Sequence, residues 1–208
     1  MKARLLDAAC AGARALARLR QKERQAPRAL VIPPAGEGSL GDAAMLNATG
    51  ATLRSLGFAG ADLLLKAGWG AVEDYARRID GNAYFYGGAI LASLGRYSHA
   101  FFVGADVVDG VYNPLSVQRR LSLLAEVAEL GGRATVLGCS FSETPDAGCV
   151  ATLAALPALV RIKARDPVSK ARLEALLDRP IDLVVDLAFL LPPRADAPKA
   201  VEALAWIE

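Results

Sequence analysis

The chain has few of the residues that build metal centres and disulfide frameworks. Its 208 residues include three cysteines, at positions 10, 139 and 149, and a single histidine, His99. No two cysteines have the CxxC spacing, so neither a zinc nor an iron–sulfur ligand set can be assembled. A sparse, odd set of cysteines is typical of a reducing compartment. We therefore expect no metal site, no disulfide and a cytoplasmic protein.

Long apolar runs are also missing, although 53% of the residues are hydrophobic. A membrane-spanning helix needs roughly 18 consecutive apolar residues, and no stretch of the chain approaches that length. The first residues contain no uninterrupted apolar region of the kind that a signal peptide has. We expect no membrane association, and the apolar residues are sufficient for one sizeable core.

Neither sign of charge dominates, since the formal net charge is +2, and we expect no nucleic-acid partner. The basic residues are unevenly spread, because residues 1–28 hold eight Lys and Arg against two Asp and Glu. Within 1–27, Leu5, Leu16 and Leu19 recur at helical spacing, which predicts a basic amphipathic helix. Such a face can bind an anionic surface or a partner. Packing on the domain through Leu and Ala is the favoured interpretation.

Short apolar runs alternate with longer segments of helical period from residue 29 onward, a pattern typical of βαβ units and a parallel sheet. Strands are expected at 29–32, 62–66, 100–104, 134–138, 159–164 and 183–186, and helices near 41–56, 114–130, 147–156 and 167–178. The aromatic and glycine-rich segment 80–99 favours no particular structure. We predict an α/β fold, with a Rossmann-like parallel sheet covered by helices on both faces at 28–193, the N-terminal helix at 1–27 and a C-terminal stub at 194–208.

A glycine-rich loop, GEGSLG at 36–41, matches the GxGxxG pattern of dinucleotide-binding loops. That fingerprint also needs a strand running directly into the first glycine and an acid at the end of the second strand. Here two prolines end the first strand early, and Asp62 lies at the wrong end of the second. Asp42, directly after the third glycine, competes for the helix N-terminus that a pyrophosphate would need. A tight turn capped by Asp42 is favoured over a dinucleotide site.

A group of cations lies in RIKARDPVSKARL at 161–173. Asp166 followed by Pro167 is an N-cap and first-turn signature, which places Arg165 at the carboxyl end of a strand. Open α/β sheets bind ligands at that edge, and a guanidinium there suits a phosphate or carboxylate. The alternative is an ion pair between Arg165 and an acid such as Asp186. For Arg165 we favour the ligand role.

Carboxylates follow other predicted strands at the same edge. Asp106, Asp109 and Asp186 come at or just after strand ends, and together with Asp42 they lie around one edge of the expected sheet. A carboxyl buried there can have a raised pKa and serve as a general acid or base. Each of these carboxylates can equally cap a helix or pair with a cation.

The order of these motifs resembles the polysaccharide pyruvyl transferase family. In that family a GxGNxGD-type loop opens the chain, as GEGSLGD does here, and a glycine-rich strand end follows, like FFVGADVVDG. An LGQS-like turn, an RDPxS motif and a DxAF strand end come next, matched by LGCS, ARDPVS and VVDLAF. The similarity covers roughly residues 29–191. It implies one half of a GT-B-like fold and transfer of pyruvyl from phosphoenolpyruvate to a sugar diol of a cell-surface polysaccharide.

The resemblance also implies roles for individual residues, with phosphoenolpyruvate as donor substrate and no cofactor. The cleft acids, whose roles as general acid and base are not separated, would be Asp42, Asp106 and Asp186. Substrate would be bound by Gly38, Ser39, Gly41, Gly104, Ser140, Arg165 and Ser169, with Arg165 as the ligand of the donor's anionic groups.

The chain also departs from the family pattern. Ser39 stands in place of an asparagine, Cys139 in place of a glutamine, and the family's second domain has no counterpart in the sequence. We therefore expect a homodimer or a second transferase chain as partner. Two other functions stay open, a non-catalytic module that partners a glycan-modifying transferase and one half of a nucleotide-sugar glycosyltransferase.

Overall fold

The computed structural model describes residues 2–21, 26–34, 39–65, 76, 79 and 81–191, with the side chains of 2–10 excepted. Within these residues the chain forms a seven-stranded sheet in the order β3-β2-β1-β4-β5-β6-β7, with every neighbouring pair parallel. The strands are β1 (Ala29–Ile32), β2 (Ala61–Leu65), β3 (Ala83–Phe85), β4 (His99–Ala105), β5 (Arg133–Cys139), β6 (Val160–Ala164) and β7 (Asp182–Leu183). Every residue of β1 and β2 is buried because both faces of the sheet are covered there, and apart from Asp62 of β2 these residues are apolar.

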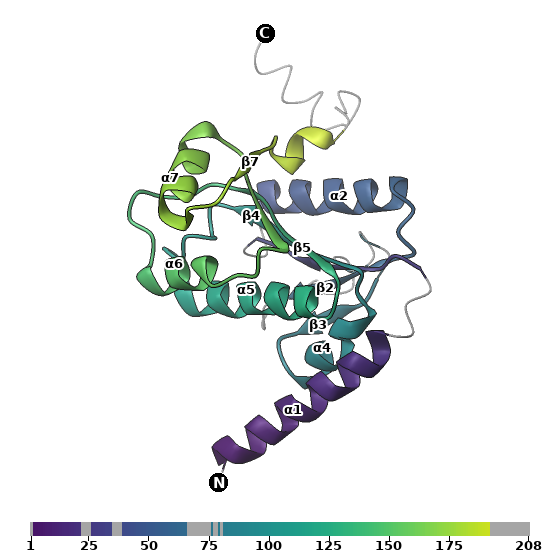
Figure 1. Ribbon diagram of the computed structural model, residues 1–208. Helices are drawn as coiled ribbons and strands as arrows, with labels where there is room; N and C mark the ends of the chain where they lie inside the picture. The colour runs from purple at the N-terminus through teal and green to yellow at the C-terminus, as the bar shows by residue number, and fades with distance from the viewer. Residues whose placement is uncertain are drawn as a thin grey trace.

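Helices cover both faces of this sheet (Figure 1). The α-helices are α1 (Lys2–Gln21), α2 (Leu40–Ser55), α4 (Gly88–Ser93), α5 (Pro114–Glu129), α6 (Ala147–Ala154) and α7 (Pro167–Leu177), and two 3-10 helices are η1 (Leu94–Arg96) and η2 (Leu187–Leu190). One core layer, with Met45 and Leu46, lies between the sheet and α2 with η2. The other, with Leu121 and Leu124, lies between the sheet and the remaining helices. The prediction of a Rossmann-like α/β fold is confirmed.

Side-chain caps fix where the longer helices begin. Asn113 accepts a hydrogen bond from the backbone N–H of Ser116 at 3.0 Å, and Pro114 follows as the first residue of α5. Asp146 starts α6 in the same way, and Asp166, followed by Pro167, starts α7. Such caps satisfy N–H groups that have no partner within the helix. Each of these helices therefore begins directly after a connection from the carboxyl edge of the sheet.

The structure differs from the expected elements at two places. The segment 80–99 contains β3, α4 and η1, and β3 was missed because it is a three-residue edge strand. The strand expected at 183–186 is wrong in extent, since β7 ends at Leu183. The chain turns away from the sheet there because Asp186 caps η2, accepting a hydrogen bond from the backbone N–H of Ala188 at 2.8 Å. The stub expected at 194–208 lies outside the described residues.

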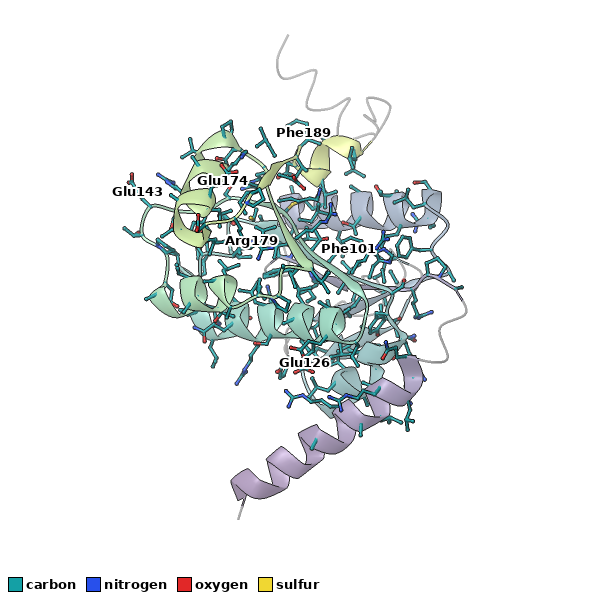
Figure 2. The ribbon with its side chains drawn as sticks, viewed as in Figure 1. Phe101, Glu126, Glu143, Glu174, Arg179 and Phe189 are labelled. Carbon is teal, nitrogen blue, oxygen red and sulfur yellow. The ribbon has the colours of Figure 1, made fainter. Side chains whose placement is uncertain are left out.

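The N-terminal helix packs against α4 and η1, on the opposite side of the sheet from α2 (Figure 1). Ala17 is buried, whereas Leu16 and Leu19 are exposed, so the small residue makes the contact rather than the leucines. Arg14 of α1 forms an ion pair at 2.8 Å with Glu126 of α5, the residue labelled in Figure 2. No helix in the described part of the chain combines the length and apolar character needed to cross a bilayer.

Candidate functional site

The strand order places a crevice at the carboxyl ends of β1 and β4. Chain connections leave these two adjacent strands toward opposite edges of the sheet, since β2 and β3 lie beyond β1 whereas β5 to β7 lie beyond β4. In open α/β sheets, ligands bind at such a switch point, outside the carboxyl ends of the strands. The sequence motifs singled out above follow β1, β4, β5, β6 and β7, and all of them therefore come to this one edge.

The turn after β1 is only partly described, because residues 35–38, including Gly38, lie outside the described residues. Ser39 is the N-cap of α2, and its Oγ accepts a hydrogen bond from the backbone N–H of Asp42 at 3.2 Å. The prediction that Asp42 caps this helix is therefore wrong. Ser39 has the extended backbone that a cap requires, whereas Asp42 lies inside the first turn, where its charge faces the positive end of the helix dipole. Gly41 is exposed in the same turn.

Asp62 has a structural role at the opposite end of the sheet. Its carboxylate accepts hydrogen bonds from Arg28 at 2.6 and 3.2 Å, from the backbone N–H of Asn82 at 2.9 Å and from the hydroxyl of Tyr97 at 2.9 Å. Burial raises the pKa of Asp62, but these hydrogen bonds outweigh burial and hold its pKa below the ordinary value. Asp62 therefore stays ionised, and it joins β2 to the segment before β1 and to the turn after η1.

Arg165, predicted as the anion ligand, is held by two neighbours at the carboxyl edge. Its Nε donates to Ser140 Oγ at 2.7 Å, and its Nη1 donates to Asp186 Oδ2 at 2.7 Å. The ion pair that the sequence offered as the alternative is thus present. Among the described residues no acceptor takes Nη2, so one face of the guanidinium still has N–H groups to offer a ligand.

Ser140 also joins β5 to the start of α7. Its Oγ donates to Asp166 Oδ2 at 3.2 Å, and Asp166 accepts from both the backbone N–H and the hydroxyl of Ser169 at 2.7 Å. Burial raises the pKa of Asp166, but the hydrogen bonds from Ser169 and Ser140 outweigh it and lower the pKa. Ser169 is buried, and its Oγ accepts from the backbone N–H of Phe141 at 2.8 Å. Ser169 therefore positions the loop after β5, with its hydroxyl already engaged.

Two adjoining pockets open beside this network and share Ser140 and Asp166. One, of about 690 Å³, is lined by Ser140, Arg165, Asp166, Pro167, Leu183, Val184, Val185, Asp186 and Phe189. The other, of about 410 Å³, is lined by Asp106, Asp109, Val111, Tyr112, Ser140, Phe141, Ser142, Asp166, Ser169 and Arg172. The predicted residues Asp106, Ser140, Arg165, Ser169 and Asp186 are thereby brought together, whereas Ser39, Gly41 and Asp42 line neither pocket.

The acids after β4 divide into an exposed one and a buried one. Asp106 is exposed and accepts a hydrogen bond from the hydroxyl of Tyr112 at 3.2 Å, which raises the pKa of that hydroxyl. Asp109 is buried and accepts from the backbone N–H groups of Val111 and Ser142 at 3.1 and 3.2 Å. Asp109 therefore links the loop after β4 to the loop after β5 by hydrogen bonds. Asp106 is the carboxylate that is exposed to a ligand.

Gly104, predicted to contact substrate, lies inside β4 against the neighbouring strand. A Cβ added at this position would lie 2.5 Å from Cys139 Cβ and 2.7 Å from Cys139 Cα. Real Cβ atoms do not approach other atoms so closely. The close approach of β4 and β5 accounts for this glycine without any ligand.

Arg120 is a candidate binding residue that the sequence interpretation missed. It lies on the buried face of α5 with Val117, Leu121 and Leu124, and its guanidinium is 5.4 Å from the ring centroid of Phe102. An arginine within the apolar stripe of an amphipathic helix was the signal that could have identified it. Its neighbour Arg119 is exposed and lies 5.6 Å from the ring centroid of Tyr86.

No group of three or more His, Cys, Asp and Glu side chains that could hold a metal ion is present in the described ranges. Cys139 and Cys149 are free and buried, and burial raises the pKa of their thiols to about 12 and about 11, respectively. The thiols therefore stay protonated and are not nucleophiles at neutral pH.

No protein-family model matches the chain, and no curated protein or solved structure is significantly similar to it.

Proposed function

We propose that the chain is a pyruvyl transferase-like protein that binds phosphoenolpyruvate at the carboxyl edge of its sheet and transfers the pyruvyl group to a sugar diol. One observation carries the proposal. Asp106, Ser140, Arg165 and Asp186, which come from four separate motifs, line two adjoining pockets. These motifs are also the ones by which the sequence resembles the polysaccharide pyruvyl transferases.

Arg165 is the group that would hold the anionic donor. Its bonds to Ser140 and Asp186 fix the plane of the guanidinium, so a ligand meets Nη2 without having to order a flexible side chain. A charge-assisted hydrogen bond to a carboxylate or phosphate oxygen is stronger than one between neutral groups. Asp186 in turn orients Arg165, which makes it a positioning residue in this proposal rather than the general base.

The transfer needs one proton donor and one proton acceptor near the donor's double bond. The methylene carbon gains a proton, the two sugar oxygens bond to the adjacent carbon, and the bond from that carbon to the phosphate oxygen breaks, releasing inorganic phosphate. The two hydroxyl protons balance the proton gained by the methyl group and the one carried by phosphate. Asp106, exposed in the 410 Å³ pocket, is the carboxylate placed to exchange a proton with a sugar hydroxyl.

A second domain or chain would complete the site, as in a GT-B-like enzyme. Apolar side chains line the rim of the larger pocket, where Val185 and Phe189 are 63% and 83% exposed. Figure 2 labels Phe189. A homodimer or a second transferase chain seated there would shield the donor from water, and positioning between two halves supplies much of the rate in such sites.

Replacing the Arg165 side chain tests the donor site. Arg165→Gln removes a charged hydrogen-bond donor, worth about 1.5–3 kcal/mol, so the Kd for phosphoenolpyruvate is expected to rise by about 10- to 100-fold in calorimetric titration. The matched control is Arg161→Gln, an exposed arginine of β6, the strand that precedes Arg165, and it lies outside both pockets. The double variant Arg165→Gln with Asp186→Asn leaves no unpaired charge behind. Unchanged affinity in both Arg165 variants would contradict the proposal.

Measuring the release of inorganic phosphate in the presence of sugar diols then distinguishes a transferase from a non-catalytic binding module. Inorganic phosphate released from phosphoenolpyruvate only when an acceptor diol is present supports transfer. Binding of phosphoenolpyruvate without turnover, in the presence of a co-purifying transferase chain, would favour a non-catalytic module. Binding of a UDP-sugar in place of phosphoenolpyruvate would favour the glycosyltransferase half.

A further inference from the structure

A third pocket lies on the other side of the crevice, at the carboxyl ends of β2 and β3. It has a volume of about 260 Å³ and is lined by Leu64, Leu65, Tyr86, Asn113, Leu115, Ser116, Arg119 and Arg120. It shares no lining residue with the two pockets around Ser140. Arg120 connects it to the switch point, because Nη1 of this arginine donates to the backbone carbonyls of Pro33, at 3.3 Å, and Pro34 at the end of β1.

The guanidinium of Arg120 is buried, and no carboxylate in the described part of the chain is bonded to it directly. The residue is 9% exposed, and no carboxylate within the described ranges forms an ion pair with it. Both of its acceptors are neutral carbonyls bonded to Nη1, and in the part of the chain that the structure describes no acceptor takes Nε or Nη2. Buried arginines are ordinarily paired or coordinate an anion, because burying an uncompensated charge is costly.

The guanidinium nevertheless stays charged under working conditions. Burial lowers the pKa of Arg120 to about 10, and the nearby charge of Asp42 acts in the opposite direction. At neutral pH the side chain therefore carries a positive charge in a largely buried position. An anion entering the pocket would place a negative charge directly beside the guanidinium, where partial burial strengthens the attraction.

The rest of the lining indicates which anion fits. Arg119 adds a second cation next to Arg120, and Ser116 adds a hydroxyl. Two cations and a hydroxyl suit a doubly charged group with several oxygens better than a single carboxylate. The volume of about 260 Å³ is below the range of roughly 300–1,000 Å³ typical of drug-sized ligands. The pocket is therefore sized for a small phosphorylated molecule, with Leu64, Leu65 and Leu115 against its uncharged part.

We infer that Arg119 and Arg120 form a binding site for the phosphate group of a small phosphomonoester, separate from the site around Arg165. This inference stands on the buried Arg120, which has no ion-pair partner among the described residues and has N–H groups without an acceptor there, and on the pocket that it lines; it does not require pyruvyl transfer. Two phosphomonoesters are relevant sources of that phosphate, namely phosphoenolpyruvate itself and a phosphorylated sugar acceptor.

Calorimetric titration of the full chain with inorganic phosphate, phosphoenolpyruvate and glucose 6-phosphate tests the inference. Arg119→Gln is the main variant, because this exposed residue can be changed without disturbing the core. We expect its Kd for the preferred phosphomonoester to rise about tenfold or more, and that of Arg120→Gln to rise further. The matched control is Arg133→Gln, an exposed arginine at the amino end of β5. If Arg120→Gln does not fold, Arg119→Gln alone decides.

The outcomes show which phosphomonoester binds in this pocket, and they distinguish binding there from binding at the site around Arg165. Glucose 6-phosphate binding that Arg119→Gln weakens, with Arg165→Gln having no effect on it, would assign the pocket to a phosphorylated acceptor. Phosphoenolpyruvate binding that both variants weaken would assign the donor's phosphate to it. Equal Kd values for wild type and Arg119→Gln with all three probes, or no binding by wild type, would overturn the inference. An effect of Arg165→Gln on phosphoenolpyruvate would still be observable in that case, so the proposed function is judged separately.

Discussion

Replacing Asp62 by alanine is expected to lower the free energy of unfolding by about 3 kcal/mol, because it removes the buried carboxylate of a partly buried ion pair and leaves its donors without an acceptor. The variant leaves Arg28 and the hydroxyl of the buried Tyr97 without their carboxylate acceptor. Urea unfolding at pH 7, followed by circular dichroism, measures the change. The control is Asp182→Ala, which removes the exposed ion pair with Lys163 and should leave the unfolding midpoint nearly unchanged. Equal midpoints for both variants would contradict the structural role of Asp62.

The same carboxylate gives the stability a defined dependence on pH. The folded-state pKa of Asp62 lies below its ordinary value of 3.8, so the unfolded chain binds this proton more readily than the folded protein does. The contribution of Asp62 is therefore fully present above the unfolded pKa, near pH 4, and is lost as the pH falls through the folded pKa. In Asp62→Ala, the loss of stability on acidification below pH 4 should be shallower than in wild type.

Adding a methyl group at Gly104 is the second change expected to have a large effect. Gly104→Ala places a Cβ 2.5 Å from Cys139 Cβ, and the backbone of β5 cannot move away without disturbing the central sheet. Overpacking of this kind costs about 1–3 kcal/mol, which urea unfolding would detect. The matched control is Gly41→Ala, whose nearest atom would be Ser39 Oγ at 3.9 Å, and its stability should equal or slightly exceed that of wild type.

The two glycine variants also separate packing from ligand binding at Gly104. The family resemblance implies that this glycine contacts substrate, and a loss of phosphoenolpyruvate affinity in Gly104→Ala with an unchanged unfolding midpoint would support that role. The close approach of β4 and β5 predicts the reverse, a lowered midpoint with the affinity of the folded fraction retained.

Local signals were sufficient to predict much of the fold. The apolar run of β1, the mostly apolar β2 and the Asp166–Pro167 start of α7 are determined by residues adjacent in sequence. The structure has all three, with β2 at Ala61–Leu65 rather than 62–66. The β3 strand was not predictable in this way. Its three residues are only partly buried at the edge of the sheet, so they show neither a continuous apolar run nor a clear alternation.

The candidate site depends more on contacts between residues distant in sequence. The sequence predicted Arg165 and Asp186 at the same edge of the sheet. The distance of 2.7 Å between Arg165 Nη1 and Asp186 Oδ2, however, follows from the register of β6 and β7 and from the turn into η2. The sequence therefore offered the ion pair as an alternative to the ligand role without deciding between them. Arg120 was missed because two adjacent arginines in a helix ordinarily face solvent, and only the direction of the buried stripe distinguishes Arg120 from Arg119.

The most direct test of the central claim is a calorimetric titration of the full chain with phosphoenolpyruvate, run beside NADH and a UDP-sugar at the same concentrations. We expect saturable heat with phosphoenolpyruvate and none with NADH, because Asp42 occupies the first turn of α2, where a dinucleotide's pyrophosphate would bind. Saturable binding of NADH or the UDP-sugar, with no heat from phosphoenolpyruvate, would contradict it.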